Sequence, residues 1–212
     1  MKIIKIVSKK KVQNNYLILD GENAILIDGS ANVSQIEENL KISAEKEKLN
    51  AIFLTHEHFD HIMELDNLIK KYDCPVYIHV AGRDNLFDEK KNLSILINDP
   101  FKIKSKKNIK TFEDGQEFEF GNIKISCYHT PGHSMGSSCF VVDNNMFVGD
   151  TVFKIDIGRN DLYGGDENIQ KISLNRILNE LSENIDNYYS GHGVNFNYED
   201  LKYNLNHFLG EN

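Results

Sequence analysis

One seven-residue segment constrains this chain more than any other: Thr55-His56-Glu57-His58-Phe59-Asp60-His61. It contains four side chains that bind transition metals, His56, His58, Asp60 and His61. Imidazole and carboxylate together suit zinc, iron or manganese. A single helix cannot aim all four at one ion, because His56 and His58 are two residues apart whereas Asp60 and His61 are adjacent. The segment therefore predicts two metals, or one metal with supporting residues around it.

The segment lies where a predicted strand gives way to a predicted helix. Residues 51–54 form a short apolar run that is typical of a buried strand. After the segment, Ile62, Leu65, Leu68 and Ile69 recur at helical spacing. Loops at strand ends are where α/β folds place their chemistry. The zincin motif His-Glu-x-x-His is excluded, because it would need a histidine at the position of Asp60.

Three further metal-capable side chains occur in one repeated context. His133, Asp150 and His192 each follow a short strand-like run, and each has a glycine directly before it. Alone, a histidine in a loop is usually a surface residue and an aspartate after a strand is usually a turn or cap. Because the same context recurs three times, we predict that these residues are metal ligands as well.

The order of these seven residues resembles the metallo-β-lactamase superfamily, whose pattern is His-x-His-x-Asp-His, then a distant His, an Asp and a last His. Residues 149–153, 158–166, 190–193 and 199–209 are similar to segments of short glyoxalase II-like (hydroxyacylglutathione hydrolase-like) hydrolases. The resemblance implies an α+β fold, a four-layer αβ/βα sandwich in which two mixed β-sheets pack face to face with helices outside. It extends over nearly the whole chain, and we expect residues 1–212 to be a single domain.

The same resemblance implies a centre of two divalent metal ions, for which zinc is our first expectation and iron or manganese is possible. His56, His58 and His133 would hold the first ion, and Asp60, His61 and His192 the second. Asp150 would bridge both, and a water shared by the ions would be a hydroxide nucleophile at neutral pH. Asp60 is also the predicted catalytic residue. Asp28, Thr55 and Thr151 are expected to support the ligands.

The implied reaction is hydrolysis of small thioesters, of which hydroxyacylglutathiones are one kind. The chain ends about twenty residues after His192, so we do not expect the C-terminal helical region that grips glutathione in full-length glyoxalase II. Lys154, Arg159 and Tyr163 could lie near the cleft instead, and Arg159 could pair with Asp161. The alternatives are a lactone or phosphodiester hydrolase of the same fold and a mononuclear-iron sulfur (persulfide) dioxygenase.

Composition narrows the function classes further. The chain has 212 residues, a net charge of −8 and 40% hydrophobic residues, as expected for a globular protein. The negative charge argues against a nucleic-acid partner, so a small-molecule substrate is expected. No apolar run approaches the roughly 20 residues that span a bilayer, and no membrane association is predicted. Cys74, Cys127 and Cys139 show no paired spacing, which favours a reducing cytoplasm. Cys127 and Cys139 lie in strand-like runs and are expected to be small buried side chains.

Hydrophobic periodicity predicts the elements of the fold. Turn dipeptides at Asp20-Gly21, Asp114-Gly115 and Asn144-Asn145 predict hairpins, and residues 84–110 are expected to be helix and then loop. The predicted strands are 2–7, 15–19, 24–28, 51–54, 118–120, 123–128, 138–142 and 146–148, and the predicted helices are 33–48, 59–71, 166–183 and 198–209.

Overall fold

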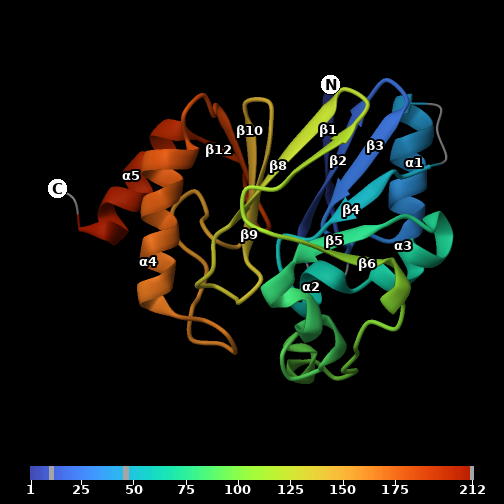
Figure 1. The fold of residues 1–212 in the computed structure, drawn as a ribbon, viewed down its shortest axis with the longest axis horizontal. Helices are drawn as coiled ribbons and strands as arrows, with labels where there is room; N and C mark the ends of the chain where they lie inside the picture. The colour runs from blue at the N-terminus through green and yellow to red at the C-terminus, as the bar shows by residue number, and fades with distance from the viewer. Residues whose placement is uncertain (10–11, 45–47, 211–212) are drawn as a thin grey trace.

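Two β-sheets form the centre of the structure, and helices cover their outer faces (Figure 1). The structure is a computed structural model that describes residues 1–9, 12–44 and 48–210. Within these residues, no helix combines the length and the apolar character needed to cross a membrane.

The first sheet contains the N-terminal strands in sequence order, β1-β2-β3-β4-β5-β6, within the described residues. Its first three strands are antiparallel, whereas β3 to β6 run parallel to one another. Parallel strands end at the same edge, which brings the loops after β3, β4 and β5 together. The strands are β1 (Lys2–Val7), β2 (Asn14–Asp20), β3 (Asn23–Ile27), β4 (Ala51–Phe53), β5 (Val76–His79) and β6 (Ile109–Phe112).

The second sheet has the order β12-β11-β10-β9-β8-β7 in the described part of the chain. Only its β10–β11 pair is parallel, so the loops that follow these two strands also share an edge. The strands are β7 (Glu117–Phe120), β8 (Ile123–His129), β9 (Ser138–Val142), β10 (Asn145–Gly149), β11 (Asn187–Ser190) and β12 (Phe196–Asn197).

Helices pack on the outside of each sheet. On the first sheet, α1 (Val33–Ala44) and α3 (Leu65–Tyr72) supply the apolar side chains that pack on the strands, and α2 (Phe59–Ile62) precedes α3. On the second sheet lie α4 (Glu167–Arg176), which continues as a π-helical turn η4 (Ile177–Leu181), and α5 (Tyr198–Leu209). Helix α5 begins with a reciprocal capping box between Asn197 and Asp200.

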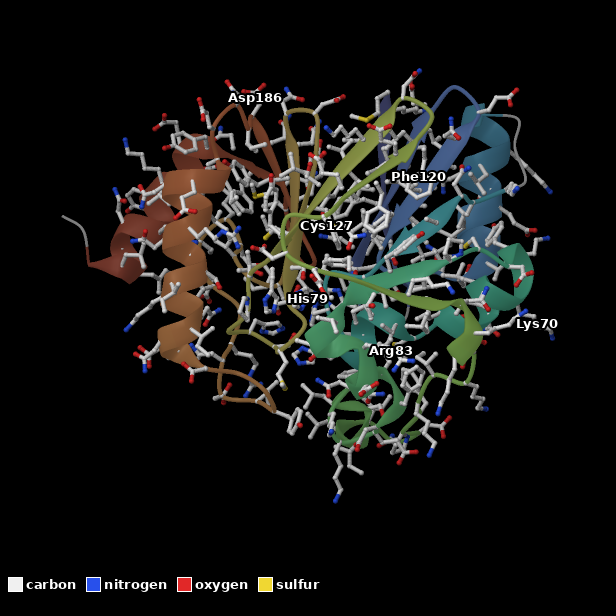
Figure 2. All side chains as sticks on the ribbon, viewed as in Figure 1. Lys70, His79, Arg83, Phe120, Cys127 and Asp186 are labelled. Atoms are coloured by element: carbon white, nitrogen blue, oxygen red, sulfur yellow. The ribbon has the colours of Figure 1, made fainter. Side chains whose placement is uncertain are left out.

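The core consists of three apolar layers, one between the two sheets and one beneath the helices on each side. Between the sheets, the ring of Phe53 lies 5.6 Å from that of Phe140, and Phe120 and Cys127 point into the same layer (Figure 2). Cys74, Cys127 and Cys139 are all buried free thiols, which confirms the burial predicted for Cys127 and Cys139. The predicted four-layer sandwich is confirmed.

The predicted helix 59–71 is interrupted, and the loop after β3 provides the physical reason. The backbone N–H of Gly29 donates to the carbonyl of His61 over 2.7 Å, and the N–H of Glu64 donates to the carbonyl of Gly29 over 3.0 Å. These bonds replace the helical partners of both groups, so α2 ends at Ile62 and α3 begins at Leu65. The interruption fixes the end of α2, where Asp60 and His61 are located.

Three other predictions differ from the structure. The Asp114-Gly115 turn does not form a hairpin, because β6 and β7 belong to different sheets and the turn carries the chain between them. Strands β5, β6 and β12 were not predicted, since they are short and lack clear alternation. Residues 84–110 contain the 3₁₀ segment η1 (Val80–Phe87), then η2 (Ser94–Leu96), η3 (Lys106–Asn108) and the start of β6.

The predicted helix 33–48 ends at Ala44 among the described residues, and its positions 45–47 lie outside them. The Asn144-Asn145 hairpin is confirmed with a shift of one residue. Its turn is formed by Asp143 and Asn144, and Asp143 adopts a positive φ of 51°.

Candidate metal centre

The histidine segment changes backbone conformation halfway, which is how it directs its ligands to two places. After β4 the chain is extended through His58, whose φ and ψ are −64° and 146°. Asp60 and His61 then lie on the first turn of α2. Alternation along the extended part places the side chains of His56 and His58 on one side and that of Glu57 on the other. The two halves therefore present separate ligand pairs.

The second sheet contributes the remaining ligands at the same edge. His133 lies in the loop after β8, Asp150 follows β10 directly, and His192 follows β11. The backbone N–H of Gly191 donates to the carbonyl of Gly149 over 2.8 Å, which ties the two parallel strand ends together. A side chain at Gly191 would place its Cβ 2.2 Å from Oδ1 of Asp150, so this close approach requires glycine.

All seven predicted ligands meet in one cluster of side chains. Their ligand atoms form overlapping groups in which every member lies within 4.8 Å of the others: His56, His58 and His133; His56, His61 and Asp150; Asp60, His61 and His192. Nε2 of His133 and Nε2 of His56 are 3.3 Å apart, and Nε2 of His192 lies 3.1 Å from Oδ2 of Asp60. The first and third groups are the two triads that the family resemblance implied.

Asp150 lies between the two triads. Its Oδ2 is 3.4 Å from Nε2 of His192 and 3.9 Å from Nε2 of His133, and its Oδ1 is 3.4 Å from Nε2 of His61. A carboxylate has two oxygens, so one side chain in this place can face ligands of both triads at once. This is the position that a bridging ligand requires.

The buried polar atoms of the cluster test whether it fits metal ions. Among the described side chains, Nε2 of His58, Nε2 of His61 and Oδ1 of Asp150 are buried without a hydrogen-bond partner. Such atoms cost free energy unless something satisfies them. All three point into the cluster, and the imidazole and carboxylate donor set suits divalent transition metals. The residues present therefore fit divalent metal ions.

Hydrogen bonds behind the imidazoles fix which ring nitrogen faces the cluster. Nδ1 of His61 donates to Oδ2 of Asp28 over 2.8 Å, and Nδ1 of His133 donates to the carbonyl of Arg159 over 2.7 Å. Because both partners can only accept, the Nδ1 atoms carry the protons and the Nε2 atoms are left as ligands. Asp28 also accepts from the backbone N–H of Thr55 over 2.8 Å, so two of the three predicted supporting residues lie beside the ligands and contact each other. The third, Thr151, has its hydroxyl 3.3 Å from that of Thr130.

Electrostatics in the cluster favour bound positive charge. Burial and then repulsion from His133 lower the pKa of His58 to about 3. Burial also acts to lower the pKa of His192, but hydrogen bonds to Asp150 and Asp60 outweigh it and raise this pKa to about 9. Burial acts to raise the pKa of Asp150, but the charge of His61 holds it well below its usual range. The carboxylates thus stabilise cations where the second triad lies.

Glu57 is a functional candidate that the sequence analysis missed. Its carboxylate is fully buried and accepts hydrogen bonds from Nδ2 of Asn85 at 3.0 Å, from Oγ of Ser134 at 3.0 Å and from the N–H of Gly136 at 3.2 Å. It therefore ties the histidine segment to the loop that carries His133. The signal for this role was available, since a residue between two ligands of an extended segment points away from the metals.

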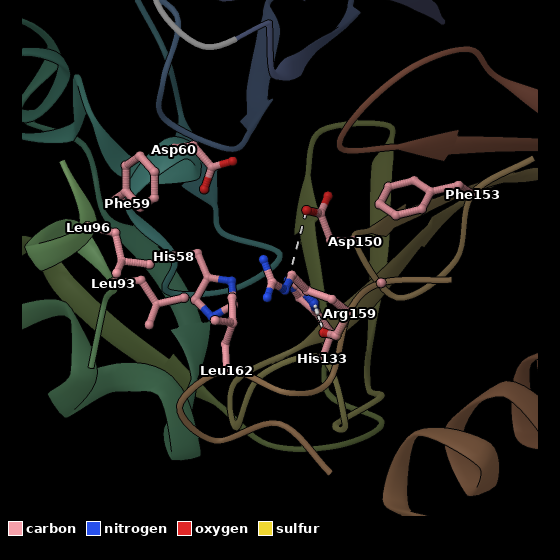
Figure 3. A pocket seen from close by; sticks show the side chains of 11 residues that line it. His58, Phe59, Asp60, Leu93, Leu96, His133, Asp150, Phe153, Arg159 and Leu162 are labelled. Atoms are coloured by element: carbon pink, nitrogen blue, oxygen red, sulfur yellow. Dashed lines mark hydrogen bonds and ion pairs between the residues drawn. The ribbon is translucent and has the colours of Figure 1, made fainter. Parts of the chain in front are cut away.

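A cleft of about 360 Å³ opens over the cluster (Figure 3). His58, Asp60, His133 and Asp150 line it, together with Arg159. The Arg159 guanidinium donates to Asp161 at 2.8 Å in an exposed pair, as the sequence allowed. The remaining lining residues are Phe59, Leu93, Leu96, Phe153, Gly158 and Leu162.

Two other residues that were predicted near the cleft do not line it. The ammonium group of Lys154 lies 3.3 Å from Oδ2 of Asp200 on α5. Tyr163 is 44% exposed, and the ammonium group of Lys91 lies 5.9 Å from its ring centroid. Lys154 is directed toward α5, and Tyr163 is one residue past the lining residue Leu162.

Known proteins are similar to this chain in sequence and in fold. Residues 9–192 match the profile of the metallo-β-lactamase superfamily. The probable metallo-hydrolase YqgX of Bacillus subtilis is 32% identical over 182 residues, 85% of this chain and 84% of that protein. The probable polyketide biosynthesis zinc-dependent hydrolase PksB of the same organism is 31% identical over 179 residues, 84% of this chain and 71% of that protein.

A solved structure extends the comparison to three dimensions. The crystal structure of the B3 metallo-β-lactamase BLEG-1 superposes with a TM-score of 0.83 and 30% sequence identity, covering 98% of this chain and 99% of that one. The family profile, the probable metallo-hydrolase relatives and the superposition agree with one another over most of the chain. The chain belongs to the metallo-β-lactamase superfamily.

Proposed function

We propose that this protein is a dinuclear metallohydrolase that cleaves thioesters. The observation that carries the dinuclear part is the position of Asp150, whose oxygens lie 3.4–3.9 Å from ligand nitrogens of both triads. His56, His58 and His133 would hold one ion, and Asp60, His61 and His192 the other. Zinc is our first candidate, and the zinc-dependent hydrolase PksB supports it. Iron and manganese suit the same donors.

Bound there, two divalent ions would lower the pKa of a water molecule and polarise a carbonyl group. Residues of the chain position the groups that take part in this chemistry. Asp60 is our candidate catalytic residue, because it lines the cleft and its carboxylate can accept a proton from a water molecule beside it. Asp28 and the carbonyl of Arg159 hold the imidazoles of His61 and His133 in place, so the site is organised before the substrate arrives.

The cleft favours a substrate whose leaving group can depart without being protonated. Apart from Asp60 and the other predicted ligands, the only titratable group among the lining residues is the guanidinium of Arg159, which does not give up its proton. An amine or alkoxide leaving group would depend on Asp60 passing on the proton it accepted, whereas a thiolate has a pKa of about 8.5 and leaves unaided. The similarity of residues 149–153 and 158–166 to glyoxalase II-like hydrolases supports the same choice.

β-Lactam hydrolysis is a second candidate, because BLEG-1 is 30% identical over 98% of this chain. A β-lactam is a strained amide, so its ring opening also makes small demands on a general acid. Sulfur dioxygenation is the rival from another reaction class, and it needs one iron rather than two ions.

One set of measurements separates these functions. Purified protein is analysed for metal content and assayed with S-lactoylglutathione, simple acyl thioesters, a β-lactam, a lactone and a phosphodiester, and for oxygen consumption with a persulfide. We expect two metals per chain and turnover of thioesters above all other substrates. One iron per active chain with persulfide-dependent oxygen uptake would replace the proposal with the dioxygenase, and a faster β-lactam reaction would replace it with the lactamase.

A further inference from the structure

The walls of the cleft are apolar, in contrast to the ligands beneath them. Phe59, Leu93 and Leu96 lie on one side, and Phe153 lies on the other (Figure 3). Leu96 is 64% exposed although it lines a cleft over charged and polar groups. Exposed apolar side chains that gather at one place mark binding surfaces.

A second cavity of about 340 Å³, here called the side pocket, adjoins the cleft. Phe153 lines both cavities, and the predicted ligand His192 lines the side pocket. Ile155 and Val194 are 83% and 62% exposed there. The other lining residues are Lys154, Asp156 and Gly193. An apolar surface therefore continues from the metal ligands, past Phe153, to Ile155 and Val194.

The wall that carries Phe153 is held rigidly by the C-terminal helix. Nδ2 of the buried Asn204 on α5 donates to the carbonyls of Phe153 and Asp156, each at 2.9 Å. The N–H of Phe153 donates to the carbonyl of Asp156 over 2.8 Å, which closes a tight turn with Ile155 inside it. These hydrogen bonds hold Ile155 toward solvent, so the surface is already formed before a ligand binds.

The opposite wall is tied to the histidine segment. The N–H of Phe59 donates to the carbonyl of Asn92 over 2.8 Å, and Nδ2 of Asn92 donates to the carbonyl of Phe101 over 2.9 Å. These bonds position Leu93 and Leu96 beside the ligands. Both walls are therefore anchored to elements that also hold the centre, so a bound group would be oriented relative to the metals.

The nearby cations are already engaged. Lys154 pairs with Asp200, and Arg159 pairs with Asp161. Common thiol carriers are polar, because they contain amides, carboxylates or phosphates. The exposed side chains of Ile155 and Val194 match none of these groups, whereas they match a hydrocarbon chain.

From these observations, and resting on the proposed thioester hydrolysis, we propose that the site selects thioesters with an apolar acyl group. The acyl chain would lie across Phe153 and reach Ile155 and Val194 in the side pocket, while the carbonyl lies over the predicted ligands. Recognition would come from burial of methylene groups rather than from contacts to the thiol carrier.

The test is a series of N-acetylcysteamine thioesters with acetyl, butyryl, hexanoyl and octanoyl groups. A fully buried methylene is worth about fourfold in affinity. Because the side pocket is open on one side, we expect roughly twofold per methylene in kcat/KM, on the order of 50-fold from acetyl to octanoyl. A parallel series varies the thiol at constant acetyl group, using coenzyme A, glutathione and N-acetylcysteamine, and we expect differences of less than about threefold.

Ile155→Ser removes the most exposed part of the surface, and Ile172→Ser on α4 is its matched control, because Ile172 is 70% exposed and lines neither cavity. We expect Ile155→Ser to reduce the octanoyl-to-acetyl ratio about fivefold and Ile172→Ser to leave it unchanged. As a readout without turnover, calorimetry on metal-free protein should show tighter binding of S-octyl- than S-ethyl-N-acetylcysteamine, and Ile155→Ser should reduce the difference.

The outcomes keep the two proposals apart. If no thioester is hydrolysed, the proposed function itself fails. If thioesters are hydrolysed without dependence on acyl length, the proposed function stands and the apolar subsite is wrong. Three further results would also overturn the subsite. Ile155→Ser could leave the chain-length dependence unchanged, the two S-alkyl probes could bind equally, or the thiol could set the substrate preference.

Discussion

At the scale of single residues, the centre depends most on Asp150, because its two oxygens approach ligands from both triads. We expect Asp150→Asn to remove a negative charge between the two ions and to weaken both sites. Metal content and activity should fall together, by at least tenfold in activity. Elemental analysis and steady-state kinetics measure this. Asp161→Asn is the control, since its ion pair is exposed and such pairs contribute little. Retention of both metals with normal turnover would show that Asp150 is not a bridge.

Glu57 is the second critical residue, although its hydrogen-bond partners are Asn85, Ser134 and Gly136 and not the predicted ligands. In Glu57→Gln, the amide nitrogen must face either Asn85 or the Ser134 and Gly136 donors, so one side loses its acceptor. We expect the free energy of unfolding to fall by about 1–3 kcal/mol. Metal should also be lost at lower chelator concentration, because the loops of His56 and His133 are less firmly joined.

Denaturant unfolding and chelator titration measure both effects of this change. The matched control is Glu119→Gln on β7, where the side chain is exposed. If Glu57→Gln is as stable as the wild type and binds metal as tightly, Glu57 does not stabilise the centre.

At the scale of elements, the ends of β5 and β8 meet through two histidines. The rings of His79 and His129 stack with centroids 3.6 Å apart. The backbone N–H of His129 donates to Asp114, which also pairs with Arg176 on α4. Burial and then repulsion from His129 lower the pKa of His79 to about 4, while Asp114 opposes the shift. The contact between the sheets therefore requires a neutral His79.

The sign of the resulting pH dependence follows from this lowered pKa. The unfolded chain binds a proton on His79 near pH 6.5, whereas the folded protein does so only near pH 4. The contribution to stability is therefore complete above pH 6.5 and is lost as the pH falls toward 4, by roughly 1–3 kcal/mol. His79→Asn retains an acceptor for the N–H of Ala81. We expect it to flatten the stability profile between pH 6.5 and 4, while His207→Asn on α5 should not. Unfolding curves at several pH values would contradict this if the slopes were equal.

At the scale of the whole molecule, the centre joins the two sheets. His56, His58, Asp60 and His61 follow β4 of the first sheet, whereas His133, Asp150 and His192 follow strands of the second. Ions bound between them would act as cross-links of the folded state. Free metal at 100 times its dissociation constant stabilises a protein by about 2.7 kcal/mol. We expect chelation to lower Tm by roughly 5–10 °C, and metal readdition to restore it.

Differential scanning calorimetry on chelated and reloaded protein measures this effect. In Asp150→Asn the chelator should change Tm much less, since that variant holds little metal. An equal Tm for chelated and loaded wild type would contradict the view that the ions link the sheets.

Local sequence patterns predict the ligand types, their order and the setting of each ligand. Loop positions after strands are local properties, because apolar runs and glycines set them over a few residues. Strands β1 and β9 and helix α5 were therefore predicted with the bounds that the structure shows. The four-layer sandwich and the two triads came from resemblance to a family and not from periodicity.

Features that depend on distant partners became visible in the folded protein alone. The break between α2 and α3 arises because Gly29 binds backbone groups of His61 and Glu64, more than thirty residues away. The role of Glu57 depends on donors at Asn85, Ser134 and Gly136. The apolar wall depends on the hydrogen bond from Asn204 to the carbonyl of Phe153. Each is a hydrogen bond between segments that only the packed sheets bring together, so no local pattern could encode it.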